Sequence, residues 1–398
     1  MLAVIETHPV QYHAPVYRAL RARHGIPVTV IYGSDFSVVG ARDVEFGVDV
    51  KWDTDLLSGY EWRFLSRIRS GGATNAETVS TGGLEEALVA VKPSAVLLLG
   101  YSPRFYRMAA YRAWRHGRPL LFRGETTDHA WRRGPVKRAV RDWMLRRLYR
   151  RCAGILYIGR RSLQHVRRLV PDHPNVRFAP YCVDAAPFQL DPRDRDRMRT
   201  EVRRQLGVAD DRLVLLFAGK ITARKGPHLL VAAAKELPHT MRDNVLILSV
   251  GSGDLQPQIT EQAGRRPIVS LRCVGFQNQT ELSRYYHAAD LLAMPSVRNE
   301  TWGLVVNEAL HHGVPCVVSD AVGCVPDLIE AGVTGEVFGA GDVRGLRDAL
   351  VRAASLVRNP ETAACCRRAV ASYSVERAAD GIADAYRWAV AAESHAVA

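Results

Sequence analysis

The chain has 398 residues, 47% hydrophobic and 24% charged, which is typical of a globular protein with room for two domains. No apolar run approaches the roughly 20 residues of a membrane span, and the first residues lack the cationic and apolar regions of a signal peptide. Seven scattered cysteines without a CxxC pair indicate a reduced environment, so we expect a cytoplasmic protein.

The net charge of +13 is concentrated in one part of the chain. Residues 100–170 contain 19 Lys and Arg but only three acids, Glu125, Asp128 and Asp142. Localised charge of this kind favours an anionic partner, such as a phospholipid surface, a polyphosphate or a nucleic acid. The alternative, which the sequence leaves open, is that these arginines only decorate solvated helices.

Short apolar runs alternate with helical patterns along the whole chain, which predicts two α/β domains with parallel sheets. The expected strands lie at 2–6, 27–33, 95–100, 119–124, 154–159, 213–219, 244–251, 268–275, 290–296 and 314–320. In open α/β sheets ligands bind at the carboxyl ends of the strands, so we expect the site residues just after these runs.

A polar, proline-containing segment separates the two halves. We therefore divide the chain into an N-terminal domain at 1–185, a junction at 186–210, a C-terminal domain at 211–374 and a last helix at 375–398 that crosses back to the N-terminal domain. A cleft between the two domains is the simplest architecture.

The basic block contains an amphipathic helical pattern at 131–152. Its apolar residues recur every four positions, at Val136, Val140, Met144 and Leu148, with Trp143 beside them. A basic amphipathic helix is compatible with an anionic membrane surface. The other interpretation is that the apolar stripe packs on the N-terminal sheet and the arginines are solvated.

The first strand of the second half ends at Gly219, and the following turn carries Lys220, Arg224, Lys225 and Gly226 before a helix begins. Glycines allow close approach of a ligand, and a helix start offers free N–H groups, so this turn suits a phosphate. It is not a Walker A loop, because the GxxxxGK[ST] spacing is absent. A plain basic turn is the alternative.

Two further strand ends carry glycines. Gly251 and Gly253 flank Ser252, and Gly275 precedes Phe276. A lone GSG sequence is weak evidence, because it often forms only a tight turn.

Two acids surround the next expected helix start. Glu300 precedes the helix, and Glu308 lies about one turn inside it, so they cannot be neighbours on one helix face. The amides of residues 303–306 can hold a phosphate. Buried acids without a ligand are costly, so a ligand rich in hydroxyls explains them better than packing does.

At this point the second half resembles the C-terminal domain of family 4 glycosyltransferases, which are retaining enzymes of the GT-B fold. The resemblance covers roughly residues 210–340 in order. The motifs that carry it are Gly219-Lys220…Arg224-Lys225-Gly226, Gly251-Ser252-Gly253, Val274-Gly275-Phe276, Pro295-Ser296…Glu300…Glu308 and Ser319-Asp320…Gly323…Asp327. Lys220 replaces the usual Arg, Cys324 the second Gly and Asp327 a Glu.

The resemblance implies two Rossmann-like domains that face a cleft, the first for the acceptor and the second for a nucleoside diphosphate sugar. It implies that Glu300 contacts the donor sugar, Glu308 the ribose, and Lys220 with Lys225 the diphosphate. The remaining implied donor-binding residues are Gly219, Gly251, Gly253, Gly275, Phe276, Thr301, Trp302, Gly303, Leu304 and Val305.

The N-terminal half departs further from the family. His8, Gln11 and His13 replace its glycine-rich loop and are acceptor-side candidates, although one histidine can be structural. Arg123 stands where many members carry a His near the donor sugar, with Glu125 behind it on the acceptor side. Arg123 could still stabilise a phosphate, because its guanidinium is rigid and always charged.

Metal chemistry is not expected. The acidic triplets 53–55 and 194–196 resemble the DxD motif of metal-dependent GT-A transferases, but neither follows a convincing buried strand. His311 and His312 are adjacent and would point in different directions. Lysines and helix amides can hold the leaving diphosphate instead.

The resemblance therefore implies a hexosyltransferase-type glycosyltransferase that retains the anomeric configuration and needs no cofactor. Its donor is a nucleoside diphosphate sugar; its acceptor is a sugar, a lipid-linked molecule or a small molecule, in polysaccharide, glycolipid or metabolite biosynthesis. The enzyme would be cytoplasmic or peripheral at the inner face of an anionic membrane. A nucleotide-sugar epimerase and a basic nucleic-acid-binding protein are the alternatives, but no nucleic-acid motif is visible, so we expect no nucleic acid partner.

Overall fold

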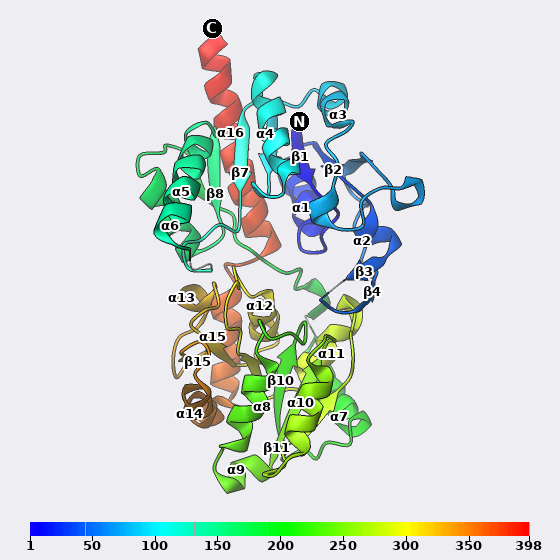
Figure 1. Cartoon of the computed structure of the whole chain (residues 1–398), viewed down its shortest axis with the longest axis vertical. Coiled ribbons are helices and arrows are strands. Elements are labelled where there is room, and N and C mark those ends of the chain that lie inside the picture. Colours follow the sequence, from blue (N-terminus) through cyan, green and yellow to red (C-terminus); the bar gives the residue numbers. More distant parts are fainter. Residues whose placement is uncertain (44, 131–132, 189, 398) are drawn as a thin grey trace.

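Two parallel sheets organise the chain, each inside its own lobe (Figure 1). The computed structural model describes residues 1–43, 45–130, 133–188 and 190–397. The seven-stranded sheet has the order β5 (Glu61–Phe64), β2 (Val28–Tyr32), β1 (Leu2–Glu6), β6 (Ala95–Leu98), β7 (Leu120–Arg123), β8 (Gly154–Tyr157), β9 (Val176–Phe178). The six-stranded sheet has the order β12 (Ser270–Cys273), β11 (Val245–Val250), β10 (Leu213–Ala218), β13 (Leu291–Met294), β14 (Cys316–Ser319), β15 (Gly335–Phe338).

Helices cover both faces of each sheet. In the N-terminal half they are α1 (Ala14–His24), α2 (Phe36–Val39), α3 (Leu84–Val91), α4 (Arg104–Arg115), α5 (Pro135–Arg150) and α6 (Arg160–Leu169). They continue with α7 (Pro192–Gln205), α8 (Pro227–Lys235), α9 (His239–Asp243), α10 (Gln256–Gly264), α11 (Gln279–Ala288), α12 (Leu304–His311), α13 (Val325–Leu328), α14 (Val343–Ala353), α15 (Pro360–Val370) and α16 (Val375–Val397).

The expected α/β fold class with two Rossmann-like halves is confirmed. All ten apolar runs form strands. Most of these strands are buried on both faces: in β1, Ala3 and Ile5 belong to one core cluster of the first sheet, and Leu2 and Val4 to the other, whereas the edge strand β12 is only half-buried. Strands β5, β9 and β15 were missed. They are short edge strands, and β5 is mostly exposed, so their sequences lack a continuous apolar run.

The last helix, α16, joins the two lobes. It rises from the lower lobe to the upper one, where it packs against α1, β8 and β9 (Figure 1). Small side chains make the contact close, and Gly381 has no room for a Cβ beside the carbonyl of Phe178. His24 Nε2 and Asp380 Oδ1 lie 2.8 Å apart at the same contact.

Helix α5 does not bury the apolar stripe that the sequence suggested. Val136, Val140 and Trp143 are 75%, 60% and 61% exposed. The buried residues of the helix are instead Arg141, Leu145 and Tyr149. The interpretation that the stripe packs on the sheet is therefore wrong for these three residues, because another face of the helix meets the core.

Residues 131 and 132, which begin the predicted basic helix, lie outside the described residues. The described helices are all too short or too polar to serve as a membrane span.

Candidate active site

Glycine turns at the carboxyl ends of three neighbouring strands pack against one another on the side of the C-terminal half that faces the N-terminal half. Gly251, with a φ of 138°, donates its N–H to the carbonyl of Gly275 at 2.8 Å, and a Cβ on it would collide with the carbonyl of Gly219. Gly253, with a φ of 158°, also has no room for a Cβ beside the carbonyl of Ile221. Only glycine fits these positions, so the turns form one preorganised layer.

Glu300 lies beside this layer in a charged cluster. Its Oε2 accepts hydrogen bonds from Lys225 Nζ and, at 3.1 Å, from Ser296 Oγ, and it lies 3.9 Å from Arg224 Nη1. Glu300 is only 9% exposed. The structure thus brings two predicted catalytic residues, Glu300 and Lys225, into direct contact.

Glu308 is fully buried on α12 and is held by three side chains. Its Oε2 accepts from Tyr286 at 2.6 Å, and its Oε1 accepts from Tyr12 at 3.2 Å and Gln279 at 3.4 Å. Burial raises the pKa of the Glu308 carboxyl, and the hydrogen bonds oppose that effect. A ribose hydroxyl would have to displace one of these partners, and Tyr12 comes from the other lobe.

The loop before α12 places its predicted donor-binding residues in different surroundings. Thr301 faces the cleft and donates to Glu125 Oε2 at 2.7 Å, which links the two lobes. Trp302 is 3% exposed and donates its Nε1–H to Asn307 at 2.8 Å. The Trp302 ring therefore packs in the core beside the site.

The start of α12 uses Gly303 as its N-cap with a φ of 103°. Leu304 and Val305 follow as half-buried residues of the first turn. Phe276, after β12, meets the ring of Phe46 at 5.0 Å between centroids.

The polar side chains that follow β1 interact mainly with other side chains of the protein. His13 Nδ1 lies 2.5 Å from Glu6 Oε1, and both side chains are buried. Gln11 donates to Gln279 Oε1 at 3.1 Å, across the cleft. Burial, with His13 nearby, lowers the pKa of His8 to about 4. The sequence suggested that either His8 or His13 has a structural role, and the buried contact with Glu6 is the environment of a structural histidine at His13.

Arg123 is 5% exposed and donates to two backbone carbonyls, those of Ala179 at 3.1 Å and Pro180 at 2.5 Å. The guanidinium thereby fixes the segment that follows β9. A contact between Arg123 and the donor stays a prediction.

A hairpin from the N-terminal half lies over the basic turn. Strands β3 (Ala41–Asp43) and β4 (Val48–Val50) reach from the upper lobe towards the lower one (Figure 1). Lys220 Nζ pairs with Asp43 Oδ2 at 3.0 Å and Glu45 Oε2 at 2.8 Å, and Arg224 pairs with Glu45 at 3.3 Å. Of the two lysines predicted to hold a diphosphate, Lys220 is therefore paired with hairpin carboxylates, whereas Lys225 is paired with Glu300.

The sequence profile of the family described as Glycosyl transferases group 1 matches residues 198–373. The chain carries a glycosyl transferases group 1 domain. This domain contains the glycine layer, the Lys225–Glu300 pair and the buried Glu308.

Curated relatives match about half of the chain or somewhat more. D-inositol 3-phosphate glycosyltransferase of Geodermatophilus obscurus is 36% identical over 209 residues, which cover 50% of this chain and 45% of the relative. Alpha-D-kanosaminyltransferase of Streptomyces kanamyceticus is 29% identical over 256 residues, covering 62% and 64%. The matches span less than two-thirds of either relative.

Solved structures match over almost the whole chain. Anabaena Alr3699/HepE in complex with UDP and glucose aligns with a TM-score of 0.68 at 18% identity, covering 96% of this chain and 98% of that one. Sucrose-phosphate synthase from Thermosynechococcus elongatus aligns with a TM-score of 0.70 at 18% identity, covering 98% and 99%. Both likenesses show that the group 1 domain and the N-terminal half together form the GT-B fold.

Several residues around the site were not predicted from the sequence. Tyr12 from the N-terminal half and Gln279 from the group 1 domain both donate to Glu308, and the only available signal was that Tyr12 adjoins Gln11. Asp43 and Glu45 gave no signal, because their hairpin has no apolar pattern.

The hairpin acids are expected to compete with an added nucleoside diphosphate for Lys220 and Arg224. Changing Asp43→Asn and Glu45→Gln together should strengthen nucleoside diphosphate binding about three- to tenfold, since each pair between partly exposed groups contributes on the order of 0.5–1 kcal/mol. Calorimetric titration with UDP, ADP and GDP measures the effect. Asp49→Asn on the same hairpin, an exposed position, is the matched control. Weaker binding by the double variant would show that the acids assist the donor instead.

Proposed function

We propose that the chain is a glycosyltransferase that moves a sugar from a nucleoside diphosphate sugar to an acceptor with retention of the anomeric configuration. The observation that carries this proposal is the Lys225–Glu300 pair beside the glycine layer of a group 1 domain. A GT-B neighbour in complex with UDP and glucose supports a nucleotide-sugar donor, and uridine diphosphate sugars are the first donors to test.

In this proposal the site acts by positioning and electrostatic stabilisation. Lys220 and Lys225 offset the negative charge that develops on the leaving diphosphate, together with the amides at the start of α12. Glu300 holds a hydroxyl of the donor sugar and, through its ion pair, keeps the Lys225 ammonium in place. The cleft between the lobes brings the acceptor to the anomeric carbon.

A product screen tests the proposal. The protein is incubated with a panel of nucleoside diphosphate sugars and with sugar, lipid-linked and small-molecule acceptors, and the products are identified by mass spectrometry. Transfer gives a glycosylated acceptor together with free nucleoside diphosphate. An isomerised nucleotide sugar, formed without an acceptor, would favour the epimerase alternative and overturn transfer. The configuration of the new linkage, read by NMR, decides retention.

Chelation should not abolish transfer. Across the described residues, His, Cys, Asp and Glu side chains nowhere gather in a group suited to a metal ion, and Asp53 and Asp55 accept hydrogen bonds from Thr280 and Ser58. Transfer rates with and without EDTA are expected to agree within about twofold, because in this proposal lysines, and not a metal ion, supply the positive charge that stabilises the leaving diphosphate. Full loss with rescue by Mn²⁺ would instead assign a metal role to Asp53 and Asp55.

We further propose that the acceptor is lipid-linked and is met at an anionic membrane surface. The surface of α5 exposes Val136, Val140 and Trp143 next to arginines, and Arg147 lies over the Trp143 ring at 5.2 Å. An exposed apolar stripe flanked by arginines matches the two-part attraction of interfacial helices. The protein would then act at the cytoplasmic face of the membrane.

A further inference from the structure

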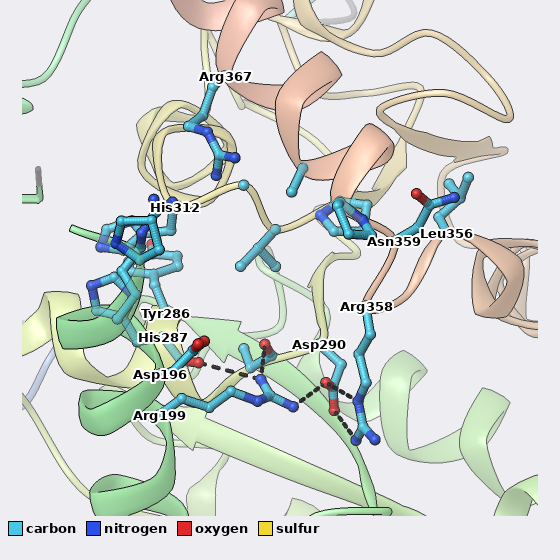
Figure 2. A pocket seen from close by; sticks show the side chains of 18 residues that line it. Asp196, Arg199, Tyr286, His287, Asp290, His312, Leu356, Arg358, Asn359 and Arg367 are labelled. Carbon is cyan, nitrogen blue, oxygen red and sulfur yellow. Dashed lines mark hydrogen bonds and ion pairs between the residues drawn. The ribbon is translucent and has the colours of Figure 1, made fainter. Parts of the chain in front are cut away.

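A second cavity lies in the C-terminal half, away from the cleft between the lobes. It has a volume of about 590 Å³ and is bounded by α7, α11, α15 and the loop before β14 (Figure 2). Asp290 and Pro315, which line it, directly precede β13 and β14. The cavity is therefore at the amino ends of these strands, whereas the candidate active site is at their carboxyl ends.

Cations outnumber acids around this cavity. Four arginines and two aspartates line it: Arg195, Arg199, Arg358, Arg367, Asp196 and Asp290. The acid that lies inside the protein, Asp290, is already shared by Arg199 at 2.6 Å, Arg358 at 3.1 Å and the buried Arg203 at 3.3 Å. Figure 2 shows Arg367 across the cavity from Arg199 and Asp290. The remaining arginines therefore receive no charge compensation from Asp290.

Arg195 and Arg367 form no ion pair within the described parts of the chain. Arg195 Nε is buried without a hydrogen-bond partner. Arg195 and Arg367 line the same cavity, and burial, together with the charge of Arg195, lowers the pKa of Arg367. Gly313 leaves room for the Arg367 guanidinium, because a Cβ there would collide with Nη1.

His287 adds a buried polar group with no partner. It is 7% exposed, lines the cavity, and its Nε2 has no hydrogen-bond partner. Leaving a buried polar group without a hydrogen-bond partner is unfavourable. A ligand with several acceptor oxygens would satisfy Arg195 Nε, and also His287 Nε2 in the tautomer that carries its proton on that nitrogen.

We infer that this cavity, here called the rear pocket, binds a small anion that carries a phosphate group. Arginine is the preferred partner of phosphate oxygens, because its planar fork can donate two hydrogen bonds at once. A volume of about 590 Å³ lies within the range of small-molecule sites, roughly 300–1,000 Å³, so the ligand can be larger than phosphate itself. The inference does not depend on the transfer reaction.

The rear pocket also touches the residues that hold Glu308. Tyr286 and His312 both line it, and their rings stack at 4.9 Å. Tyr286 donates to the Glu308 carboxylate at 2.6 Å, and His312 Nδ1 lies 2.6 Å from the Glu308 carbonyl oxygen. An anion bound there would therefore lie one side chain away from the candidate active site.

The test separates the rear pocket from the cleft. Inorganic phosphate and pyrophosphate are titrated calorimetrically into the Lys220→Gln/Lys225→Gln double variant, in which the cleft cations are removed. Adding Arg195→Gln and Arg367→Gln is expected to weaken binding at least tenfold. Adding Arg193→Gln and Arg344→Gln, at exposed arginines of the same half, is the matched control and should change binding less than twofold.

Three outcomes would overturn the inference: no binding in the lysine variant, equal weakening by the control pair, or binding unchanged without Arg195 and Arg367. Thermal unfolding checks that the variants fold, and removing one of two repelling charges should not lower the melting temperature. If the variant with both Arg195→Gln and Arg367→Gln does not fold, the single variant Arg195→Gln is titrated in its place. If phosphatidylglycerol vesicles compete with phosphate for the rear pocket, the natural ligand is a lipid headgroup. If they do not compete, it is a soluble phosphate ester.

Discussion

Changing Glu300→Gln or Lys225→Ala is expected to lower the turnover of sugar transfer about 100-fold or more, because each removes a preorganised charged contact to the donor. The two side chains are paired in the structure, so each substitution also leaves its partner without the opposite charge. For this reason the double variant should lose less than the product of the two single losses. Steady-state kinetics with the donor found in the product screen measures both turnover and KM.

Glu330→Gln, at an exposed acid of the same half, is the matched control and should keep normal turnover. Circular dichroism and thermal unfolding show whether the variants keep the fold. Near-normal turnover in both Glu300→Gln and Lys225→Ala would remove the roles proposed for this pair. A raised KM with unchanged turnover would instead assign the pair to ground-state binding of the donor.

Changing Arg146, Arg147, Arg150 and Arg151 to Gln is expected to weaken binding to anionic vesicles about 100-fold or more. Each arginine near such a surface contributes on the order of 1 kcal/mol, so the four together outweigh weak insertion of the exposed apolar residues. Arg146 contributes least, because its Nε also donates to the carbonyl of Leu169 at 3.3 Å. Sedimentation with anionic and neutral liposomes, at low and high salt, measures the binding.

The control for the arginine variant changes four exposed arginines of the C-terminal half to Gln, namely Arg193, Arg266, Arg272 and Arg344. It removes the same charge and should bind anionic vesicles like the unchanged protein. A separate Trp143→Ala variant should weaken binding even at high salt, where the charge term is screened. Equal, weak binding of all proteins to both kinds of liposome would exclude the membrane surface and leave a soluble acceptor.

The two parallel sheets could be predicted because the pattern that specifies them is local. A strand buried on both faces needs apolar residues at most positions, and runs such as 213–219 and 244–251 carry that pattern without reference to any other part of the chain. Edge strands such as β5 are covered on fewer sides, so their residues vary and leave no comparable pattern.

The residues of the candidate site in the C-terminal half could likewise be predicted from a local pattern, because glycines and lysines that follow a strand in the sequence stay beside the end of that strand in the fold. The sequence alone determined the glycine turns after β10 to β12, the basic turn with Lys220 and Lys225, and the positions of Glu300 and Glu308 around the start of α12. Their backbone requirements, a positive φ or a free helix start, are properties of a few consecutive residues.

Tertiary structure alone decided which groups face these residues. Asp43 lies 177 positions from Lys220, and Tyr12 lies 296 positions from Glu308. It also decided that Val136 and Val140 face outward, because the docking angle of α5, and not its own periodicity, selects the face that meets the core. Charge compensation and burial depend on distances between segments that are remote in sequence, and no local pattern encodes those distances.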